Sequence, residues 1–338
     1  MRVVLFDTHT YDRESFTSAN EGFGHDLTFL EPRLTRETAA LAAGHEVVCA
    51  FVNDRLDRPA LHVLQSSGVR LVALRSAGYN HVDLEAAAEL GLPIVRVPEY
   101  SPYAVAEHAV GLVLALNRKI HRAYSRVREW NFSLDGLVGF DLHGKTVGVI
   151  GTGRIGRAAA HIFHGFGCRI LAHDVRPDPT LAAQLGVRYV DLAEIYRESH
   201  IISLHVPLTP ATHHLIGADG LSRMKRGVVI INTGRGALID SRALIGALKV
   251  GQVGGAGLDV YEEEEGVFFR DLSNEVLQDD VLARLLTFPN VLVTSHQAFL
   301  TKEALASIAS TTLANITAFQ RGESLVNEVR ISDVTIKL

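Results

Sequence analysis

The sequence is poor in cysteine and has no long apolar run. Its two cysteines, Cys49 and Cys168, lie far apart among 338 residues. Their number and spacing predict no disulfide framework and no metal site, and they favour a reducing compartment, so we expect a cytoplasmic protein. The longest apolar run, 109–116, is far shorter than the roughly 18 residues of a membrane-spanning helix. We therefore expect no membrane partner.

The chain also lacks a surplus of positive charge. It carries 33 Lys and Arg residues against 38 Asp and Glu residues, a net charge of -5. This balance argues against a nucleic-acid partner. With 47% hydrophobic and 21% charged residues, the composition is that of a globular protein, and the length is typical of two domains. The first residues, MRVVLFDTHTYD, predict a strand rather than a signal sequence.

Short β-branched and apolar runs alternate with helix-length amphipathic stretches along the whole chain. This alternation predicts βα units and parallel sheets covered on both faces. The runs fall into two sets, which are 3–6, 46–51, 71–74 and 93–97, and then 146–150, 169–173, 201–205, 228–232, 257–260 and 291–294. The fold class is therefore α/β, with two Rossmann-like parallel-sheet domains, one flavodoxin-like and one doubly wound.

Two helical patterns connect the strand sets. The stretch 103–120 repeats apolar residues at helical spacing between the two sets, and 302–319 does so after the second set. Since no low-complexity linker separates the sets, we expect the chain to cross between domains through helices. Residues 1–100 and 297–338 then form a discontinuous substrate domain, and 101–296 form a cofactor domain. A cleft between two domains is the expected place for a ligand.

A glycine-rich turn follows the strand 146–150 directly. Gly151, Gly153 and Gly156 make a G-x-G-x-x-G pattern that also contains Arg154 and Ile155, and a helix-forming stretch comes next. In this context the glycines permit a tight turn, approach of the backbone to a pyrophosphate, and close packing of helix on strand. The pattern therefore predicts a dinucleotide site. The alternative, a glycine turn that only packs a helix against a sheet, explains the turn but predicts no acidic residue after the next strand.

Such an acidic residue is present. Asp174 follows the strand 169–173, about 20 residues after the glycines, where a carboxylate accepts hydrogen bonds from ribose hydroxyls. The same carboxylate repels a 2′-phosphate, so NAD is favoured over NADP, although Arg176 lies close in sequence and weakens this argument.

Three chemically active residues lie near the carboxyl ends of strands in the larger set, the edge at which doubly wound folds bind ligands. Arg235 stands between glycines and is suited to binding a carboxylate and polarising a carbonyl. His296 is suited to exchanging a proton with an alcohol near neutral pH. Glu264 lies in the acidic run 262–265, and the residues alone do not decide which of the four carboxylates would orient the histidine. Surface roles for all three stay open on local chemistry alone.

These motifs in this order resemble the D-2-hydroxyacid dehydrogenase family over essentially the whole chain, with the lactate branch as the best match. The fingerprint, Arg235 and His296 carry much of the likeness. Further matching stretches are 75–83, 97–102, 106–109, 131–134, 232–240, 259–264 and 296–301. The resemblance implies NAD as the cofactor and a small 2-oxoacid, pyruvate in the lactate branch, as the substrate. It also implies a homodimer or homotetramer formed through the cofactor domains.

The resemblance assigns roles to further residues. The family places its catalytic glutamate five residues after the aspartate of the Asp-Val-aromatic motif, which selects Glu264. The implied substrate contacts are Arg235, His296, Ala77, Gly78, Tyr100 and Phe299. The further cofactor contacts that we predict are His205, Val206, Pro207, Thr233, Gly234 and Asp259. Two departures are that Glu265 and Gly266 follow the glutamate where many relatives have proline, and that Gly234 replaces an alanine or serine.

The implied reaction is reduction of pyruvate to D-lactate, with hydride from NADH and a proton from His296. Reduction of glyoxylate, hydroxypyruvate, phenylpyruvate or a branched 2-ketoacid is the alternative within the family. A corepressor that binds NAD(H) without turnover is the alternative outside catalysis, and it is disfavoured because the Arg235, Glu264 and His296 set is complete. A formate-type enzyme is disfavoured because a glutamine is expected at position 264.

Overall fold

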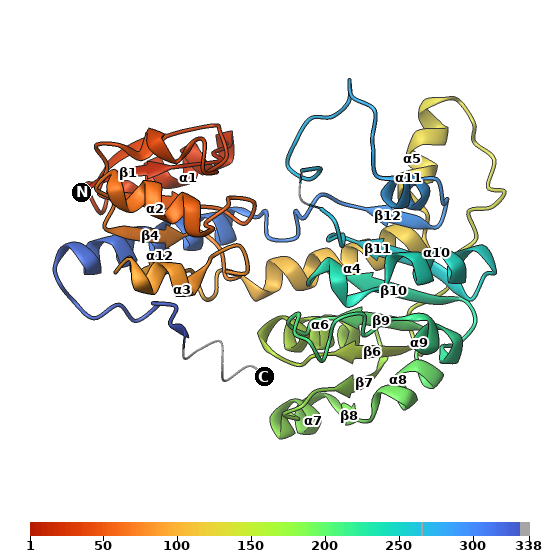
Figure 1. The fold of residues 1–338 in the computed structure, drawn as a ribbon. Helices are drawn as coiled ribbons and strands as arrows, with labels where there is room; N and C mark the ends of the chain where they lie inside the picture. The colour runs from red at the N-terminus through yellow and green to blue at the C-terminus, as the bar shows by residue number, and fades with distance from the viewer. Residues whose placement is uncertain (265, 332–338) are drawn as a thin grey trace. The chain divides into compact units, whose positions relative to one another are not determined.

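The computed structural model describes residues 1–264 and 266–331, and these residues form two compact units. The first unit joins Met1–Ser101 to Leu300–Leu338, and the second is the continuous segment Pro102–Phe299. Figure 1 labels many of the elements of both units. No helix in the described part of the chain is both long and apolar enough to cross a membrane.

The first unit is built on a five-stranded parallel sheet in the order β2-β1-β3-β4-β5. This is the flavodoxin-like order 2-1-3-4-5. Its central strands are continuous apolar runs and are buried on both faces, as expected of a covered parallel sheet. The strands are β1 (Arg2–Leu5), β2 (Asp26–Phe29), β3 (Val47–Ala50), β4 (Leu71–Leu74) and β5 (Ile94–Val95).

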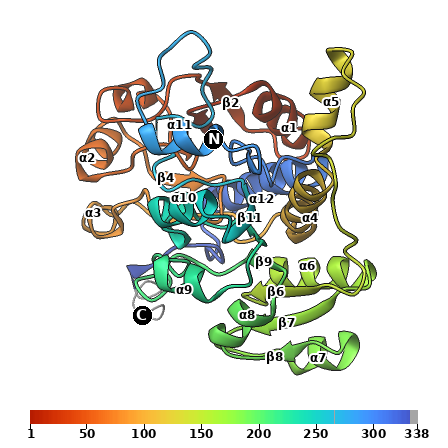
Figure 2. The same ribbon diagram turned by 90° about the vertical axis from the view of Figure 1, so that its right-hand side faces the viewer.

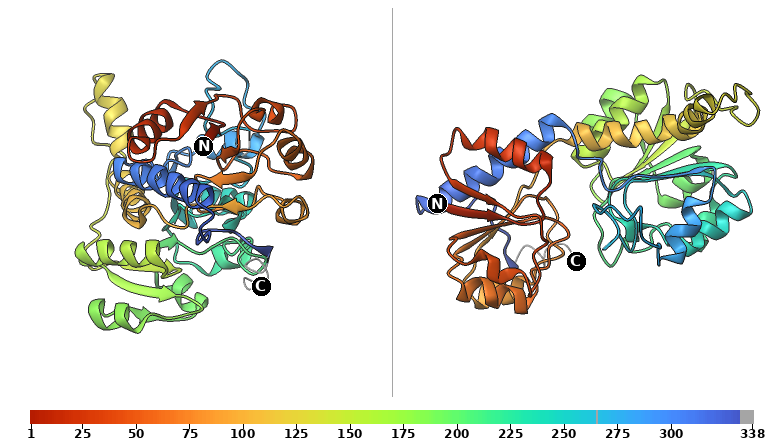
Figure 3. Two further views of the ribbon diagram at one scale, coloured as in Figure 1. Left: turned by 90° about the vertical axis from the view of Figure 1, so that its left-hand side faces the viewer. Right: turned by 90° about the horizontal axis from the view of Figure 1, so that it is seen from above.

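Helices cover both faces of this sheet. On one face α1 (Thr10–Asn20) packs against α12 (Lys302–Gln320), and α12 also contacts β4 (Figure 3). The other face is covered by η1 (Ala39–Ala42), α2 (Arg58–Ser66) and α3 (Leu84–Glu89), whose apolar side chains join one core. Aspartate or threonine side chains accept from backbone N–H groups at the starts of α2, α3 and α12, a cap worth about 1 kcal/mol each.

The second unit is built on a seven-stranded parallel sheet in the order β12-β11-β10-β9-β6-β7-β8. Numbered from β6, this is the doubly wound order 3-2-1-4-5-6 with one further strand at the end (Figure 1). Figure 2 labels the consecutive strands β9, β6, β7 and β8 of this order. The order reverses between β6 and β9, which pair directly. The strands are β6 (Thr146–Ile150), β7 (Arg169–His173), β8 (Arg188–Tyr189), β9 (Ile201–Leu204), β10 (Val228–Asn232), β11 (Val253–Leu258) and β12 (Val291–Val293).

Two apolar cores lie on the two faces of this sheet. One is formed with α4 (Pro102–Asn117) and α6 (Arg154–Gly165), which pack against each other. The other is formed with α8 (Leu192–Glu198), α9 (Ala218–Arg223), α10 (Ser241–Lys249) and α11 (Asp280–Leu286). The remaining elements are α5 (Ile120–Arg128), α7 (Pro179–Leu185) and η2 (Gly236–Leu238).

The observed unit boundaries differ by a few residues from those expected from the sequence. We place the changes after residues 100 and 296, whereas the units divide after Ser101 and Phe299. The second difference has a clear cause. The backbone N–H groups of Gln297 and Ala298 donate to the carboxylate of Asp259, which lies just after β11, so these residues belong with the second unit.

Three features of the sheets are not expected from the sequence. The short edge strands β2 and β8 are partly exposed and lack the continuous apolar runs of the inner strands. The third feature is the length of β11, which starts at Val253 and is rich in glycine. A Cβ atom at Gly257 would lie 2.8 Å from Ile231 Cδ1 and 3.1 Å from Leu112 Cβ, so glycine here lets α4 pack close to the sheet.

Candidate active site

The glycine fingerprint lies where the strand order of the second unit reverses. Gly151, just after β6, has a φ of 92°, and a Cβ atom there would lie 2.6 Å from the carbonyl oxygen of His205, just after β9. A Cβ atom at Gly156 would lie 1.8 Å from the carbonyl oxygen of Gly151. Both positions therefore require glycine. A Cβ atom at Gly153 would meet no atom of the described residues within 4 Å, so among these residues the turn is open on the side where α6 begins.

The start of α6 is suited to an anion. Its N-cap residue is Gly153, which makes no side-chain cap hydrogen bond to the helix. The start of a helix presents backbone N–H groups and the positive end of its dipole, which together bind phosphate groups. Arg154 and Ile155 are the first residues of this turn.

Asp174 lies beside the fingerprint, just after β7. Its carboxylate accepts from the backbone N–H of Thr152 at 2.6 Å and from that of Arg176 at 2.8 Å. Burial by itself raises the pKa of Asp174, but these hydrogen bonds and one from the Thr152 hydroxyl outweigh it, so the pKa lies below its ordinary value. The side chain is therefore a fixed anion, as an acceptor for ribose hydroxyls requires.

The carboxyl ends of β9 and β10 complete this edge. Burial lowers the pKa of His205 to about 4, so its imidazole is neutral at pH 7. Its Nε2 is hydrogen-bonded to the Ser203 hydroxyl at 2.8 Å. Val206 and Pro207 follow it, and Thr233 and Gly234 follow β10. The Thr233 hydroxyl is buried and has no hydrogen-bond partner among the described residues. An orphaned hydroxyl at this edge fits a ligand group, and the whole set of residues fits a dinucleotide.

Glu264 and His296 are in direct contact. The imidazole Nδ1 of His296 lies 2.8 Å from Glu264 Oε1, while Glu264 Oε2 accepts from the backbone N–H of Tyr261 at 3.1 Å. Both carboxylate oxygens are therefore held, and Nε2 of His296 is the ring nitrogen left to face a substrate. The Phe269 ring lies tilted beside the imidazole, with centroids 5.9 Å apart. Glu265, the next residue of the acidic run, lies outside the described residues.

The backbone of His296 is strained. Its φ is 54°, in the left-handed region that a residue with a Cβ atom rarely adopts. Such a conformation costs on the order of 1 to 3 kcal/mol and persists only where surrounding contacts hold it. Here the backbone N–H of His296 donates to the carbonyl oxygen of Asp259 at 2.7 Å.

The side chain of Asp259 provides most of this support. It is fully buried and accepts from the Thr294 hydroxyl at 2.5 Å and from the backbone N–H groups of Gln297 and Ala298 at 2.9 Å each. His108, on α4, lies 3.3 Å from the same carboxylate and 3.1 Å from the Thr294 hydroxyl. Burial raises the pKa of Asp259, but these bonds outweigh it and hold the pKa below its ordinary value.

Arg235 lies in a turn fixed by its neighbours. The side-chain carbonyl of Asn232 accepts from the N–H of Gly234 at 3.0 Å, and its amide donates to the carbonyl of Arg235 at 2.8 Å. A Cβ atom at Gly236 would lie 2.0 Å from the Tyr261 carbonyl group. The turn that carries Arg235 thus packs, backbone against backbone, on the loop that leads to Glu264.

The other predicted substrate residues divide between the units. Phe299 is a buried residue at the end of the second unit, whereas Ala77, Gly78 and Tyr100 belong to the first. In that unit Arg96 donates to the carbonyl of Ala77 and Ser76 donates to the carbonyl of Gly78, each at 2.8 Å, which fixes this loop. Contact of these residues with a substrate stays a prediction, as does contact of Asp259 with the cofactor.

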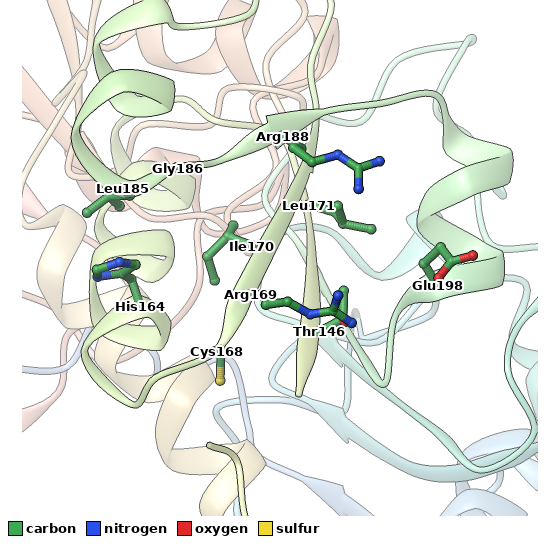
Figure 4. A pocket seen from close by; sticks show the side chains of 10 residues that line it. All are labelled: Thr146, His164, Cys168, Arg169, Ile170, Leu171, Leu185, Gly186, Arg188 and Glu198. Atoms are coloured by element: carbon green, nitrogen blue, oxygen red, sulfur yellow. The ribbon is translucent and has the colours of Figure 1, made fainter. Parts of the chain in front are cut away.

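A separate cavity of about 400 Å³ lies at the other edge of the same sheet. Thr146 and Arg169, the first residues of β6 and β7, line it together with Cys168, Arg188 and Glu198 (Figure 4). It lies at the amino ends of the strands and contains none of the predicted catalytic or cofactor residues. Burial raises the pKa of the Cys168 thiol to about 11, so this thiol is protonated and unreactive at neutral pH.

The dinucleotide edge, the carboxylate-supported histidine and the arginine turn together define a nicotinamide-dependent dehydrogenase. Comparison with known proteins agrees. Residues 110–298 match the NAD binding domain of the D-isomer specific 2-hydroxyacid dehydrogenases. The chain is 54% identical over 330 residues to D-lactate dehydrogenase of Escherichia coli, which covers 97% of this chain and 100% of that protein.

Solved structures give the same result. The pyruvate reductase of Chlamydomonas reinhardtii is similar with a TM-score of 0.93 and 46% identity, covering 97% of this chain and 98% of that one. D-lactate dehydrogenase with NAD+ from Lactobacillus jensenii is similar with a TM-score of 0.82 and 31% identity, covering 97% and 99%. The chain therefore belongs to the D-isomer specific 2-hydroxyacid dehydrogenase family, and it is an NAD-dependent oxidoreductase.

Sequence reasoning missed the residues that support the site. His108 and Thr294 lie in or beside stretches that match the family, but nothing in their spacing shows that both contact Asp259. The sequence identifies Gly236 only as a glycine next to Arg235 and gives it no role. Its packing against Tyr261 depends on two loops that are distant in sequence.

Replacement of Gly156 by alanine tests the fingerprint. The added methyl group would meet the Gly151 carbonyl, so we expect Gly156→Ala to weaken NADH binding at least about tenfold, measured by fluorescence titration. Gly165→Ala is the matched control, because it lies in the same helix and its Cβ atom would meet nothing within 4 Å. Equal affinity of the two variants for NADH would contradict the proposed geometry.

Replacement of Asp259 by asparagine tests the support of His296. The substitution turns one side-chain oxygen into an N–H donor that faces backbone N–H groups. The free energy of unfolding, measured with urea, should therefore fall by about 1 to 3 kcal/mol. A loosened His296 loop should lower kcat about 100-fold. Because the pKa of Asp259 is depressed, its stabilisation is present above about pH 4 and lost on acidification, so the variant should lose less stability below that pH.

The control for this experiment is Asp219→Asn, which alters an exposed carboxylate on α9. The equilibrium constant for unfolding of this variant should stay within about twofold of the wild-type value. Its kcat should also stay within about twofold of the wild-type value. A normal kcat for Asp259→Asn would show that the loop holds its conformation without the buried charge.

Proposed function

We propose that the protein is a D-lactate dehydrogenase that reduces pyruvate to D-lactate. The observation that carries the proposal is the hydrogen bond between Glu264 and His296, which leaves one imidazole nitrogen for the substrate. Support for pyruvate comes from the similar proteins, among which are a D-lactate dehydrogenase and a pyruvate reductase. Other 2-oxoacids are the alternative substrates within the same chemistry.

His296 acts as the acid in this reaction. The carboxylate of Glu264 accepts the Nδ1–H hydrogen bond, stabilises the positive imidazolium and fixes the ring plane. Nε2–H then donates its proton to the carbonyl oxygen of the 2-oxoacid as that oxygen becomes an alcohol. In the reverse direction neutral His296 accepts the proton at the same atom.

Arg235 binds the carboxylate of the substrate and stabilises negative charge that develops on the carbonyl oxygen. Its turn lies against the Glu264 loop through Gly236, so the arginine and the histidine pair are positioned by one packed assembly of loops. Ala77, Gly78, Tyr100 and Phe299 are the further proposed substrate contacts.

NADH supplies the hydride that reduces the carbonyl carbon. The residues proposed to hold it are the first turn of α6 for the pyrophosphate, Asp174 for the adenosine ribose, and the ends of β9 and β10, including the orphaned Thr233 hydroxyl, for the remainder. Hydrogen bonds from the backbone N–H groups of Thr152 and Arg176 already orient the carboxylate of Asp174, which reduces the entropy cost of holding the cofactor.

We also propose a homodimer or homotetramer that forms through the second unit. After α4, the chain extends as α5 and a following segment, shown in yellow in Figure 1. This region exposes large apolar side chains, including Trp130 at 84% and Phe132 at 66%. Exposed apolar clusters of this kind mark association surfaces. Sedimentation velocity measures the assembly size.

A cytoplasmic location is supported by the two free, buried cysteines.

The substrate is tested by following NADH absorbance with pyruvate, glyoxylate, hydroxypyruvate, phenylpyruvate and 2-oxoisocaproate in parallel. We expect the highest kcat/KM with pyruvate and D-lactate as the only enantiomer formed. A preference for another 2-oxoacid would change the assigned substrate and leave the proposed mechanism unchanged. NADH binding with no turnover on any of them would instead support a binding protein that responds to NADH.

The role of His296 is tested by its pH dependence. Because reduction needs protonated His296, kcat/KM for pyruvate should fall as pH rises, and oxidation of D-lactate should show the opposite trend. His296→Gln should lower kcat by a factor of about 100 to 10,000 and abolish this pH dependence. His62→Gln, on the exposed face of α2, is the control and should behave as wild type. Unchanged turnover and pH profile in His296→Gln would eliminate the assignment.

A further inference from the structure

A cluster of residues of metal-ligating types lies in the second unit. His213 and His214, in the loop between β9 and α9, lie close to Glu262, in the loop after β11. One ligand atom from each of the three lies within 4.8 Å of the other two. None of the three has a role in the reaction proposed above.

The backbone brings the two adjacent imidazoles to the same side. His214 has a φ of 50°, in the left-handed region, and the rings of His213 and His214 stack with centroids 4.0 Å apart. Neighbouring residues in extended backbone point in opposite directions, so this arrangement depends on the unusual conformation of His214. The backbone N–H of His214 donates to the carbonyl of Ala237, and this bond holds the conformation.

Glu262 provides the oxygen ligand. Its Oε1 lies 2.5 Å from His214 Nε2, and its Oε2 lies 3.5 Å from the backbone N–H of Ser241. The side chains of His214 and Glu262 are 34% and 26% exposed, so an ion could enter from solvent without rearrangement of the core. His213 is the exposed member of the cluster.

The surroundings carry further acidic residues, because Glu263 and Glu264 follow Glu262 directly in the sequence. Nearby carboxylates attract a cation. Two imidazoles and a carboxylate are a ligand set that zinc and similar divalent metals bind in proteins, with a fourth position left for water.

We propose that His213, His214 and Glu262 form a binding site for Zn²⁺ or a similar first-row divalent cation. The sequence spacing of the cysteines predicts no metal site, and this set contains no cysteine. In a tetrahedral zinc site neighbouring ligand atoms are roughly 3.3 Å apart. Binding therefore requires His214 and Glu262 to separate slightly and His213 to move closer, both within the range of side-chain rotation.

The site would link three segments of the second unit. The loop of His214 is hydrogen-bonded to η2, which follows Arg235, and Glu262 lies two residues before Glu264. A bound ion would thus connect the loops that carry the catalytic residues Arg235 and Glu264. Since the unfolded chain does not hold these ligands together, binding should raise the Tm of the protein.

The experiment is isothermal titration of the chelator-treated full-length protein with ZnCl2, with thermal unfolding measured in parallel. Wild type should bind one ion per chain at this site and gain Tm. His213→Ala and Glu262→Gln should each weaken binding at least about tenfold, the loss that even an outer-shell change causes. Because His213 is exposed, its replacement should leave the fold and the basal activity unchanged.

Two controls define the site. His62→Ala removes an exposed histidine from the first unit and should bind zinc as wild type does. His296→Gln separates this cluster from the catalytic histidine and should also retain the ion. With Co²⁺ in place of Zn²⁺, visible absorption should appear without a thiolate charge-transfer band, because both cysteines are buried elsewhere.

Three results would overturn the proposal. Wild type that binds no zinc would show that His214 and Glu262 form only a hydrogen-bonded link between loops. Equal binding by wild type, His213→Ala and Glu262→Gln would place the ion elsewhere. Loss of binding in His296→Gln alone would place it at the catalytic pair. None of these results depends on which 2-oxoacid the enzyme reduces.

Discussion

The catalytic arrangement depends on one buried carboxylate. Asp259 accepts from the Thr294 hydroxyl and from two successive backbone N–H groups, and its own carbonyl accepts from His296. An ionised group with no exposure is costly unless it is fully hydrogen-bonded. Here the bonds that satisfy the charge come from Thr294, Gln297 and Ala298, on both sides of His296, and so hold the chain that carries the left-handed conformation. The requirement to satisfy a buried anion therefore determines where the imidazole lies.

Close backbone approach is the second constraint on the site. At Gly156 and Gly236 the space for a side chain is occupied by the backbone of another segment. The first contact joins the cofactor turn to its own helix, and the second joins the arginine turn to the acidic loop. Substrate-binding and proton-transferring groups are thus placed by main-chain contacts, which move far less than long side chains do.

The sequence predicted the local elements that have strong periodic or apolar patterns. The inner strands, α4 and α12, and the glycine turn with its acidic partner were all found near the expected residues, and the α/β class is confirmed. Edge strands such as β8 were missed because they are short and partly exposed. The acidic run 262–265 shows a different limit. Composition could not choose among its carboxylates, and the family resemblance selected Glu264, which the structure places against His296.

Other features were beyond sequence reasoning because they depend on distant contacts. His108 and Asp259 are about 150 positions apart, and His214 and Glu262 are separated by 48. No periodicity or spacing connects such pairs. The left-handed backbone at His214 and His296 was equally hidden, because histidine adopts a positive φ more often than most residues do but still only in a small minority of cases.

The division of the chain also orders its folding during synthesis. The second unit is one continuous segment, so all its strands and helices are available before the ribosome reaches α12. The first unit is different, because α1 packs against α12, which follows the whole second unit in the sequence. Its sheet must therefore persist with one apolar face incompletely covered until α12 has been made. Exposed apolar surface of this kind attracts chaperones and promotes aggregation, so the unit that begins first is the one most at risk while the chain is being made.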